Sequence, residues 1–327
     1  MDVTYFYRNQ RAGYSIAKVF KTLKNELRKY KSVEECFVPR YRANLFSVLQ
    51  NMIYVFKHRN KHGINHITGE IHYCVMALIG CKSVLTIHDI SALDCIKNPV
   101  KKWMIRMIWF KLPLKFSDKI ICISDHTKEG VMKLTRRNDI EVIYNSVDPM
   151  FSVHRKQFNT ERPVILQVGT AWNKNLKNVI QALRGIPCHL SIIGAVDELM
   201  LNILVKNNIS YEINVGLTDE KLLQQYRNCD IVSFCSIYEG FGMPIIEGNA
   251  VGRCVLTSFI SPMTEVASYA AVLVDPSNTH SIESGFRRII SDAVLRRNLI
   301  ENGMINIVRF SVAKAALKHI KLYENLK

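Results

Sequence analysis

Ser236-Ile-Tyr-Glu-Gly-Phe-Gly-Met-Pro-Ile-Ile-Glu247 is the stretch that decides the fold of this 327-residue chain. An apolar run from Cys229 to Cys235 precedes it and predicts a strand, and the residues from Pro244 onward have helical spacing. We therefore expect a strand, a glycine turn and a helix, in that order. Glycine lets a ligand approach the backbone closely, and a helix N-terminus offers N–H groups to hydroxyl or phosphate oxygens.

Two carboxylates, Glu239 and Glu247, stand in this motif with seven residues between them. Glu239 falls in the turn and Glu247 lies farther along the helix, so both side chains can face one cleft. Carboxylates in such a cleft accept hydrogen bonds from sugar hydroxyls. The pattern fits equally well with a glycine-rich turn whose acidic side chains are simply solvated, and the spacing alone leaves both interpretations open.

Composition predicts a globular protein with two domains. Hydrophobic residues make up 48% of the chain and charged residues 22%. No apolar run approaches the roughly 18 residues of a membrane-spanning helix. The first residues lack the basic-then-apolar order of a signal peptide, so we expect a cytoplasmic protein. Nine cysteines without a Cys-x-x-Cys pair are expected to be buried thiols and not metal ligands.

The positive charge lies mainly in the first half of the chain. Residues 1–150 carry 25 Lys and Arg against 13 Asp and Glu, a net charge of +12, and the whole chain carries +16. This predicts an anionic partner: a nucleic acid, an acidic membrane surface or a phosphorylated substrate. No segment resembles a nucleic-acid-binding motif, so a basic nucleic-acid-binding protein is kept only as a remote alternative.

Apolar runs that predict strands alternate with helical segments in both halves, which is typical of parallel α/β sheets. We expect strands at residues 3–7, 52–57, 64–68, 83–87 and 119–123, and then at 164–168, 190–193, 211–215, 231–234, 254–257 and 271–274. The expected domains are residues 1–150, residues 151–310, and a C-terminal helix over 311–327 that packs back on the first domain. Two Rossmann-like, doubly wound domains facing each other would hold a ligand in an interdomain cleft, at the carboxyl ends of their strands.

Two further side chains stand at the ends of predicted strands. Lys174 follows the strand 164–168 where a helix begins, and a lysine beside a helix N-terminus is well placed to neutralise a diphosphate. Lysines near helix starts are nevertheless most often solvated. His88 follows the strand 83–87, and its side chain either projects into the cleft or caps the strand; the sequence leaves both open.

Together these segments resemble the retaining GT-B glycosyltransferases of family 4, over nearly the whole chain and in the right order. In the second half the resemblance rests on Gly169 with Lys174-Asn175, the Glu239 to Glu247 motif, Pro262 to Glu265-Val-Ala, and Val274-Asp275-Pro276. In the first half His88-Asp89, Ser124 and Asn145-Ser-Val-Asp148 match more loosely.

The resemblance implies a donor site in the second domain. Lys174, in the same turn as Gly169 and Thr170, would bind the diphosphate of a GDP- or UDP-sugar. Glu247 would hold the ribose hydroxyls, and Glu239 would lie beside the donor sugar.

The backbone N–H groups of Phe241, Gly242 and Met243 would approach sugar and phosphate oxygens, and His88 would stand near the reacting centre. The resemblance implies retention of the anomeric configuration without a metal or other cofactor, because protein cations and helix dipoles stabilise the departing diphosphate.

The chain departs from the family pattern at two places. Many members have an arginine where Thr170 stands, so diphosphate binding would rest mainly on Lys174 and backbone amides. The loop after the first strand, often glycine-rich, offers only Gly13. Gly13 and Ser15 would still form that loop, with Arg8 or Arg11 meeting an anionic acceptor.

The function implied is transfer of a sugar from a nucleotide-diphosphate sugar to a glycan or lipid-diphosphate-linked acceptor, in bacterial surface polysaccharide synthesis (capsule or O-antigen). A sugar phosphorylase or a nucleotide-sugar epimerase of the same fold is the alternative.

The segment 101–116 mixes apolar and aromatic residues with five basic ones: Lys101, Lys102, Arg106, Lys111 and Lys115. It is either an interfacial helix on anionic lipid, which would make the protein peripheral on the inner face of a membrane, or a buried helix whose lysines reach water. The buried helix is favoured.

Overall fold

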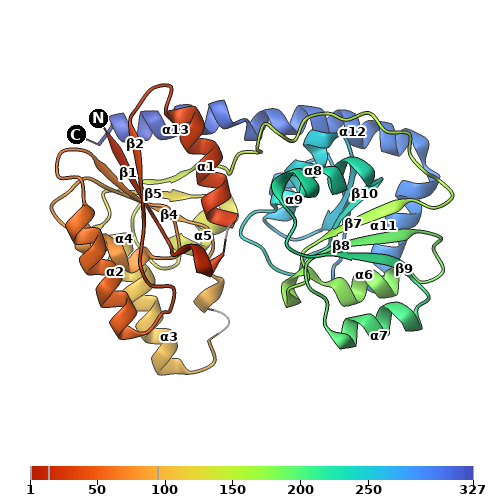
Figure 1. Ribbon diagram of the computed structural model, residues 1–327, viewed down its shortest axis with the longest axis horizontal. Helices are drawn as coiled ribbons and strands as arrows, with labels where there is room; N and C mark the ends of the chain where they lie inside the picture. The colour runs from red at the N-terminus through yellow and green to blue at the C-terminus, as the bar shows by residue number, and fades with distance from the viewer. Residues whose placement is uncertain (1, 14, 94–95, 327) are drawn as a thin grey trace. The chain divides into compact units, whose positions relative to one another are not determined.

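The computed structural model describes residues 2–13, 15–93 and 96–326. These residues form two compact units (Figure 1). One is the chain up to Ser146 together with the segment from Ser311 onward, and the other is Val147–Phe310. Each unit contains one six-stranded parallel sheet, so the predicted α/β class is confirmed.

The first unit has the strand order β2-β1-β3-β4-β5-β6. Its strands are β1 (Val3–Tyr7), β2 (Val33–Phe37), β3 (Ile64–Ile67), β4 (Ser83–Ile87), β5 (Lys119–Cys122) and β6 (Ile140–Val142). Its helices are α1 (Ser15–Leu27), α2 (Leu45–His58), α3 (Pro99–Ile105), α4 (Leu112–Phe116), α5 (Asp125–Met132) and α13 (Val312–Glu324), with shorter turns η1 (Gln10–Ala12), η2 (His72–Leu78) and η4 (Arg106–Lys111). Because β1 pairs with β2 on one side and with β3 on the other, the winding of the sheet reverses between β1 and β3.

The second unit has the strand order β12-β11-β10-β7-β8-β9. Its strands are β7 (Val164–Val168), β8 (His189–Ile193), β9 (Ser210–Asn214), β10 (Ile231–Phe234), β11 (Cys254–Ser258) and β12 (Val272–Val274). Its helices are α6 (Leu176–Ala182), α7 (Glu198–Lys206), α8 (Asp219–Asn228), α9 (Met243–Val251), α10 (Met263–Ala267), α11 (Thr279–Ser291) and α12 (Ala293–Ile307). The winding reverses between β7 and β10, and open α/β sheets bind ligands at the carboxyl ends of the strands on either side of such a reversal.

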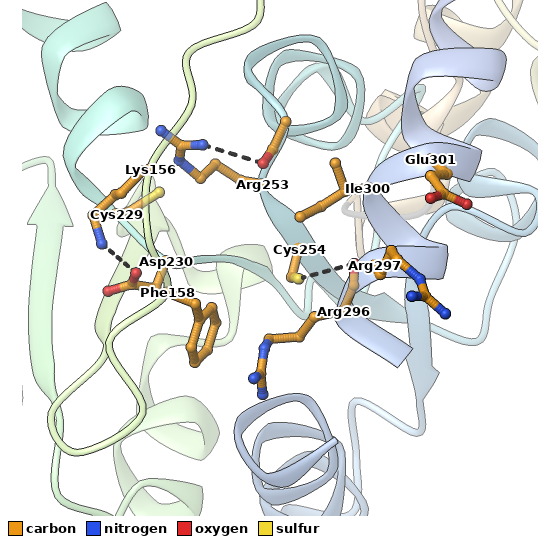
Figure 2. A pocket seen from close by; sticks show the side chains of 11 residues that line it. Lys156, Phe158, Cys229, Asp230, Arg253, Cys254, Arg296, Arg297, Ile300 and Glu301 are labelled. Atoms are coloured by element: carbon orange, nitrogen blue, oxygen red, sulfur yellow. Dashed lines mark hydrogen bonds and ion pairs between the residues drawn. The ribbon is translucent and has the colours of Figure 1, made fainter. Parts of the chain in front are cut away.

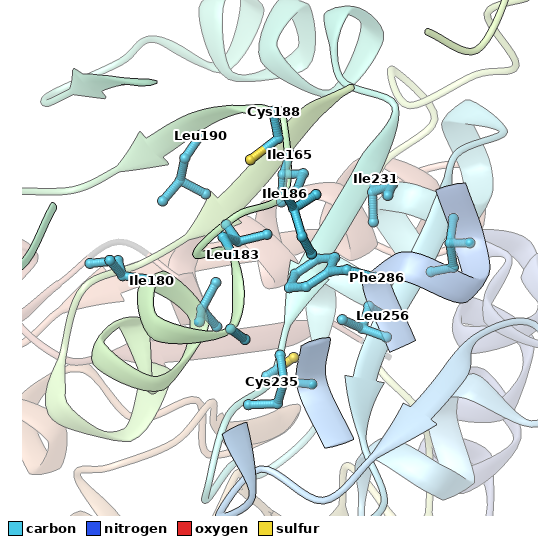
Figure 3. Close-up of a cluster of buried hydrophobic side chains, with 14 of the residues drawn as sticks. Ile165, Ile180, Leu183, Ile186, Cys188, Leu190, Ile231, Cys235, Leu256 and Phe286 are labelled. Carbon is cyan, nitrogen blue, oxygen red and sulfur yellow. The ribbon is translucent and has the colours of Figure 1, made fainter. Parts of the chain in front are cut away.

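The core of the second unit fixes the helix that follows β7. Ile165 and Ile231 from neighbouring strands pack with Ile180 of α6 and Phe286 of α11, and all four are fully buried (Figure 3). A close-packed interior is hardly compressible, so it leaves the elements packed against it little freedom to move. The turn between β7 and α6 is therefore held at both of its ends.

The C-terminal helix α13 belongs to the first unit, where it packs against α1 (Figure 1). Its Tyr323 hydroxyl lies 2.7 Å from Nδ1 of the buried His66 in β3 and 3.2 Å from the hydroxyl of Tyr5 in β1. Polar groups buried in this way are stabilised by hydrogen bonding to one another.

One predicted strand is wrong. Residues 52–57 lie in helix α2, whose buried positions Val48, Asn51 and Val55 recur at helical spacing. Apolar residues next to these positions, such as Ile53 and Phe56, are exposed, so the run is apolar on both faces and resembles a strand buried on both faces. The sequence also failed to indicate β2, an edge strand that contains two consecutive glutamates.

The segment 101–116 is not one buried helix. It consists of three consecutive helical segments, α3, the π-helical turn η4 and α4. Phe110 and Leu114 are buried, as favoured above, but no residue of α3 is buried and Trp103 is 63% exposed. Among the described residues, no helix is both long and apolar enough to cross a bilayer.

Candidate active site

The turn between β7 and α6 places Lys174 over Gly169. Gly169 has a φ of +90°, and a Cβ there would approach Cγ and Cε of Lys174 to 3.1 Å. A side chain at this position would therefore displace the lysine as well as strain the backbone. The ammonium group also lies 4.8 Å from the centre of the Phe234 ring at the end of β10, a favourable cation–π distance.

Lys174 meets Glu239 across the reversal in the sheet. Its Nζ donates to Oε1 of Glu239 at 2.6 Å, and Nδ2 of Asn173 donates to the same oxygen at 3.2 Å. Among the described residues, no hydrogen bond is found to the other oxygen, Oε2, of Glu239. The structure thus brings together two of the predicted site residues, 65 positions apart, at the carboxyl ends of β7 and β10.

Asn175 fixes the geometry of this turn. It adopts a left-handed conformation with φ of 60°, and its Nδ2 donates to the carbonyl of Cys235 at 3.0 Å and to that of Pro276 at 2.7 Å. Asparagine tolerates this backbone region better than most residues. The sequence placed Asn175 at the start of the helix, and its side chain ties the turn to the segments that follow β10 and β12.

Thr170, the next residue after Gly169, points to a neighbouring strand end. Its Oγ1 donates to the carbonyl of Ala195 at 2.6 Å, and the missing side chain of Gly194 leaves room for it, since a Cβ there would lie 2.9 Å from that oxygen. The threonine hydroxyl thus holds the turn after β8 beside the turn after β7.

Helix α9 starts at the glycine turn that the motif predicts. Gly242, with φ of +124°, is its N-cap, Met243 is its first residue, and within the described chain no side chain caps it. The ring of Phe241 is buried and packs edge-on against Phe310, with centroids 5.7 Å apart. The turn is therefore anchored by an aromatic side chain while its backbone leads into a helix N-terminus, which favours anions.

Glu247 lies inside α9 and is only 8% exposed. The hydroxyl of Tyr226, in α8, donates to its Oε2 at 2.6 Å. Burial and the neighbouring Glu247 carboxylate raise the pKa of Tyr226 well above its usual value, so the hydroxyl keeps its proton and remains a donor. The carboxylate is thereby oriented before any ligand arrives.

The loop after β1 in the first unit is built around Arg8. Its guanidinium forms an ion pair with Glu70, which follows β3 and has a positive φ of 56°. Gly13, with φ of +125°, leaves room for the same guanidinium, since a Cβ there would lie 2.7 Å from Nη2. Arg11 is exposed in η1, and Ser15 begins α1, although the Ser15 side chain lies outside what the structure describes.

His88 follows β4 directly, as expected. Its Nε2 lies 2.8 Å from the carbonyl of Thr68, which can only accept, so Nε2 carries the proton and Nδ1 is an acceptor in the neutral ring. Burial lowers the pKa of His88 more than the Thr68 hydrogen bond raises it, which favours the neutral form. Gly69 gives the ring space, since a Cβ there would lie 2.5 Å from Cδ2.

Comparison with known proteins identifies the class of enzyme. Residues 151–305 match the model of the glycosyl transferases group 1, and residues 9–151 match that of glycosyltransferase family 4. The chain is a GT-B glycosyltransferase of group 1. The two matches meet at residue 151, close to the boundary between the two structural units.

Relatives and solved structures agree with this assignment. The glycosyltransferase is 28% identical to an uncharacterised glycosyltransferase of Methanocaldococcus jannaschii over 88% of its own length and 81% of the relative's. It is 21% identical, over 88% of its length and 84% of the other's, to the N,N'-diacetylbacillosaminyl-diphospho-undecaprenol alpha-1,3-N-acetylgalactosaminyltransferase of Campylobacter jejuni. Its fold matches sucrose-phosphate synthase from Thermosynechococcus elongatus with a TM-score of 0.83 at 15% identity, covering 100% of this chain and 99% of that one.

Three residues of the site were missed from the sequence: Asn173, Tyr226 and Glu70. Asn173 stands beside Lys174, and its side-chain amide, a hydrogen-bond donor next to a predicted site residue, could have been recognised. Tyr226 and Glu70 gave none, because each acts on a partner distant in sequence: Glu247, 21 positions away, and Arg8, 62 positions away. Within the described residues, no group of three His, Cys, Asp or Glu side chains is placed to hold a metal ion.

A pocket of about 350 Å³ in the glycosyltransferase's second unit lies at the opposite edge of the sheet, by Asp230 and Arg253, which precede β10 and β11 (Figure 2). Three of its charged side chains serve the fold. Arg253 donates to five backbone carbonyls, and Lys156 pairs with Asp230. We therefore take the carboxyl ends of the strands, and not this pocket, as the candidate site.

Proposed function

We propose that this glycosyltransferase transfers a sugar, with retention of configuration, from a nucleotide-diphosphate sugar to a lipid-diphosphate-linked or glycan acceptor. The observation that carries the proposal is the contact between Lys174 and Glu239, formed at the reversal of the second sheet and beside the N-terminus of α9. The assignment of the donor to the second domain and of the acceptor to the first is part of this proposal.

The Lys174 ammonium would leave Glu239 for the donor diphosphate, which carries more negative charge than one carboxylate. A cation held at this place stabilises the charge that develops on the departing diphosphate, and a fixed cation in a partly buried site does this well. Glu239, with Oε2 unused among the described residues, would then accept a hydrogen bond from a hydroxyl of the donor sugar.

Glu247 would hold the ribose. A carboxylate can accept two hydroxyl donors from neighbouring ribose carbons, and the Tyr226 hydroxyl fixes one of its oxygens in place. Because both the carboxylate and the tyrosine are buried, this interaction would be made in a site from which water is largely excluded.

The chemical step needs no side-chain nucleophile in this scheme. The acceptor oxygen forms its bond to the anomeric carbon on the face from which the diphosphate leaves, the bond from that carbon to the diphosphate oxygen breaks, and the acceptor proton passes to the leaving phosphate oxygen. His88, neutral and with Nδ1 as an acceptor, would orient a sugar hydroxyl near the reacting carbon. No metal or organic cofactor is required by this scheme.

The acceptor and the pathway are supported by charge and by the named relative. Residues 1–150 carry a net charge of +12, which suits an acceptor attached to a lipid diphosphate. The Campylobacter jejuni relative is named for action on a diphospho-undecaprenol acceptor. We accordingly propose a role in assembling a bacterial surface polysaccharide on a lipid carrier.

Two measurements test the proposal in sequence. A thermal-shift panel of UDP-, GDP- and ADP-sugars on the purified chain should give stabilisation by at least one of them, because a ligand that binds only the folded state raises the melting temperature. Proton NMR of the product formed from that donor should show the anomeric configuration of the donor sugar. An inverted product would refute retention, and phosphate-dependent turnover without a nucleotide would indicate a phosphorylase instead.

A further inference from the structure

Helix α2 buries two polar side chains, Ser47 and Asn51, and exposes a stripe of large apolar ones. Five large apolar residues on it are between 49% and 74% exposed: Leu45, Phe46, Leu49, Ile53 and Phe56. At the angular spacing of an α-helix these five fall within an arc of about 100°. The stripe is as ordered as a buried helix face, yet among the described residues it faces solvent.

The inward face of α2 is where its buried polar side chains lie. Asn51 and Ser47 are buried, and Asn51 donates to the hydroxyl of Tyr73 at 2.8 Å and to the carbonyl of Arg40 at 3.0 Å. Its Oδ1 accepts from the backbone N–H of Arg40 at 3.0 Å. These bonds fix the rotation of α2 about its axis, so the outward stripe cannot turn inward without leaving buried polar groups unpaired.

Basic residues frame the stripe at both ends. Arg40 and Arg42 precede α2, Lys57 lies in its last turn, and Arg59 and Lys61 follow it, while the chain from Cys36 to Gly69 contains no Asp or Glu. Two of the arginines lie over aromatic rings of the stripe, with Cζ 5.8 Å from the ring centre of Phe46 for Arg40 and 3.4 Å from that of Phe56 for Arg59.

We propose that this surface, the α2 stripe with its basic frame, docks the protein on an anionic lipid bilayer. Aromatic and aliphatic side chains on one helix face, with arginines and lysines beside them, match a bilayer interface, where apolar groups enter the acyl region and cations meet lipid phosphates. A second copy of the chain would bring two all-basic surfaces together, so self-association through this face is disfavoured by charge.

The proposal differs from an interfacial role for residues 101–116. Helix α3 in that segment also exposes apolar residues, Val100 and Trp103, and carries Lys101 and Lys102. Its exposed apolar set is smaller, three residues with Met104 against five on α2, and farther along the segment Phe110 and Leu114 are buried while Phe116 is 39% exposed. The α2 stripe therefore supplies the main apolar contact, and it requires neither donor nor acceptor chemistry.

Vesicle co-sedimentation of the full chain tests the proposal, with sucrose-loaded vesicles of phosphatidylcholine alone and of phosphatidylcholine with phosphatidylglycerol in a roughly 3:1 ratio. The stripe variant is Phe46→Ser with Phe56→Ser, and the frame variant is Arg42→Gln with Lys57→Gln. Matched controls are Leu199→Ser with Val205→Ser, on the similarly exposed face of α7, and Val100→Ser with Trp103→Ser on α3. Thermal unfolding of every variant checks that the substitutions at these exposed positions leave the fold intact.

The wild type should sediment with the anionic vesicles and much less with the neutral ones. The stripe variant, which lacks two aromatic side chains, should lose about a hundredfold of the vesicle partition coefficient, since each aromatic side chain gains roughly tenfold on leaving water. The frame variant should lose roughly fivefold for each charge removed, a loss abolished at high salt. Both control variants should bind within about twofold of the wild type.

Three results would overturn the proposal. They are full recovery of the wild type in the supernatant at low salt, unchanged binding of the stripe variant, or a larger loss for the α3 variant than for the stripe variant. Sedimentation velocity gives a further check. If the wild type is a dimer and the stripe variant alone is a monomer, the face binds a second copy of the chain instead of a bilayer. Vesicle binding without any sugar transfer would leave this inference standing and count only against the proposed function.

Discussion

The two sheets have the same arrangement at the carboxyl ends of their strands, an ion pair across the reversal, but different neighbouring groups. In the second unit Lys174 pairs with Glu239 across the reversal between β7 and β10, and in the first unit Arg8 pairs with Glu70 across the reversal between β1 and β3. In each, a glycine of positive φ clears the space that a long side chain occupies. A cation, a carboxylate and a glycine thus stand together at a strand reversal in both units.

The difference lies in what stands beside each pair. Beside the second pair lies the N-terminus of α9, which no side chain caps within the described residues and which favours phosphate. The first edge has His88, a neutral imidazole with an accepting Nδ1, which suits a hydroxyl. Under the proposed function the two similar sites would meet different groups, a leaving diphosphate at the second sheet and a sugar hydroxyl at the first.

Removal of the Lys174 ammonium, the cation at the carboxyl ends of β7 and β10, should have the largest effect on turnover. Lys174→Ala should lower turnover by about 10²–10³-fold, because a cation on the developing diphosphate charge acts mainly in the transition state. Initial rates with a saturating acceptor measure this. Lys177→Ala, three residues on and exposed on α6, is the matched control and should be near wild type. Equal rates in the two variants would contradict the assignment.

Removal of the His88 imidazole, at the end of β4 in the first unit, should lower turnover by a smaller factor. His88→Ala should lower turnover by roughly 10–10²-fold, as expected for loss of one positioned polar group. Because burial lowers the pKa of His88 below its usual 6.5, the ring is neutral at pH 7 and gains its proton only as the pH falls through that lowered value. The wild-type rate should therefore have an acid limb that His88→Asn loses. An identical pH profile in both would argue against a role for the imidazole.

The space that glycine leaves for Lys174 gives the third comparison. Gly169→Ala should weaken donor binding by about tenfold and cost roughly 1–3 kcal/mol of stability, since the added Cβ meets the lysine stem at a strained φ. Gly185→Ala, at φ of +75° with no atom within 4 Å of the new Cβ, imposes the strain without the contact. Equal donor affinities in the two variants would show that Lys174 had not been displaced.

The smallest effect is expected at Glu247, the proposed ribose ligand. Tyr226→Phe removes the hydroxyl that orients Glu247 and leaves a buried carboxylate oxygen short of a donor. We expect a loss of about 1–2 kcal/mol in the free energy of unfolding, measured by urea denaturation, and a few-fold weaker donor binding. A lower free energy of unfolding with unchanged donor affinity would show that Tyr226 stabilises the fold but does not contribute to donor binding.

Sequence predicted the second edge better than the first for a physical reason. The strands β7 and β10 have the predicted bounds, and Lys174 and Glu239 each lie in the short turn that follows one of them, so position in the chain predicts position at the carboxyl ends of the strands. In the first unit the partner of Arg8 is Glu70, in a turn with no recognisable motif, and its role depends on which strands are neighbours. Strand order is a tertiary property that no local pattern encodes.

The error at residues 52–57 has a related cause. Periodicity predicts helices when only one face is apolar, and α2 has apolar residues on its outward face as well as its inward one. The feature that misled the prediction is thus the feature proposed to meet a bilayer. Tyr226 was missed because its hydroxyl serves a carboxylate on another helix, which only packing reveals.

Calorimetric titration of the donor into the wild type and into Lys174→Ala tests the central claim most directly. With whichever of the UDP- and GDP-sugars stabilises the protein, the wild type should give a saturable isotherm, and Lys174→Ala should bind at least about tenfold more weakly with its fold intact. Superimposable isotherms would show that the lysine at the second sheet edge does not hold the donor diphosphate, and the account of this site would fail.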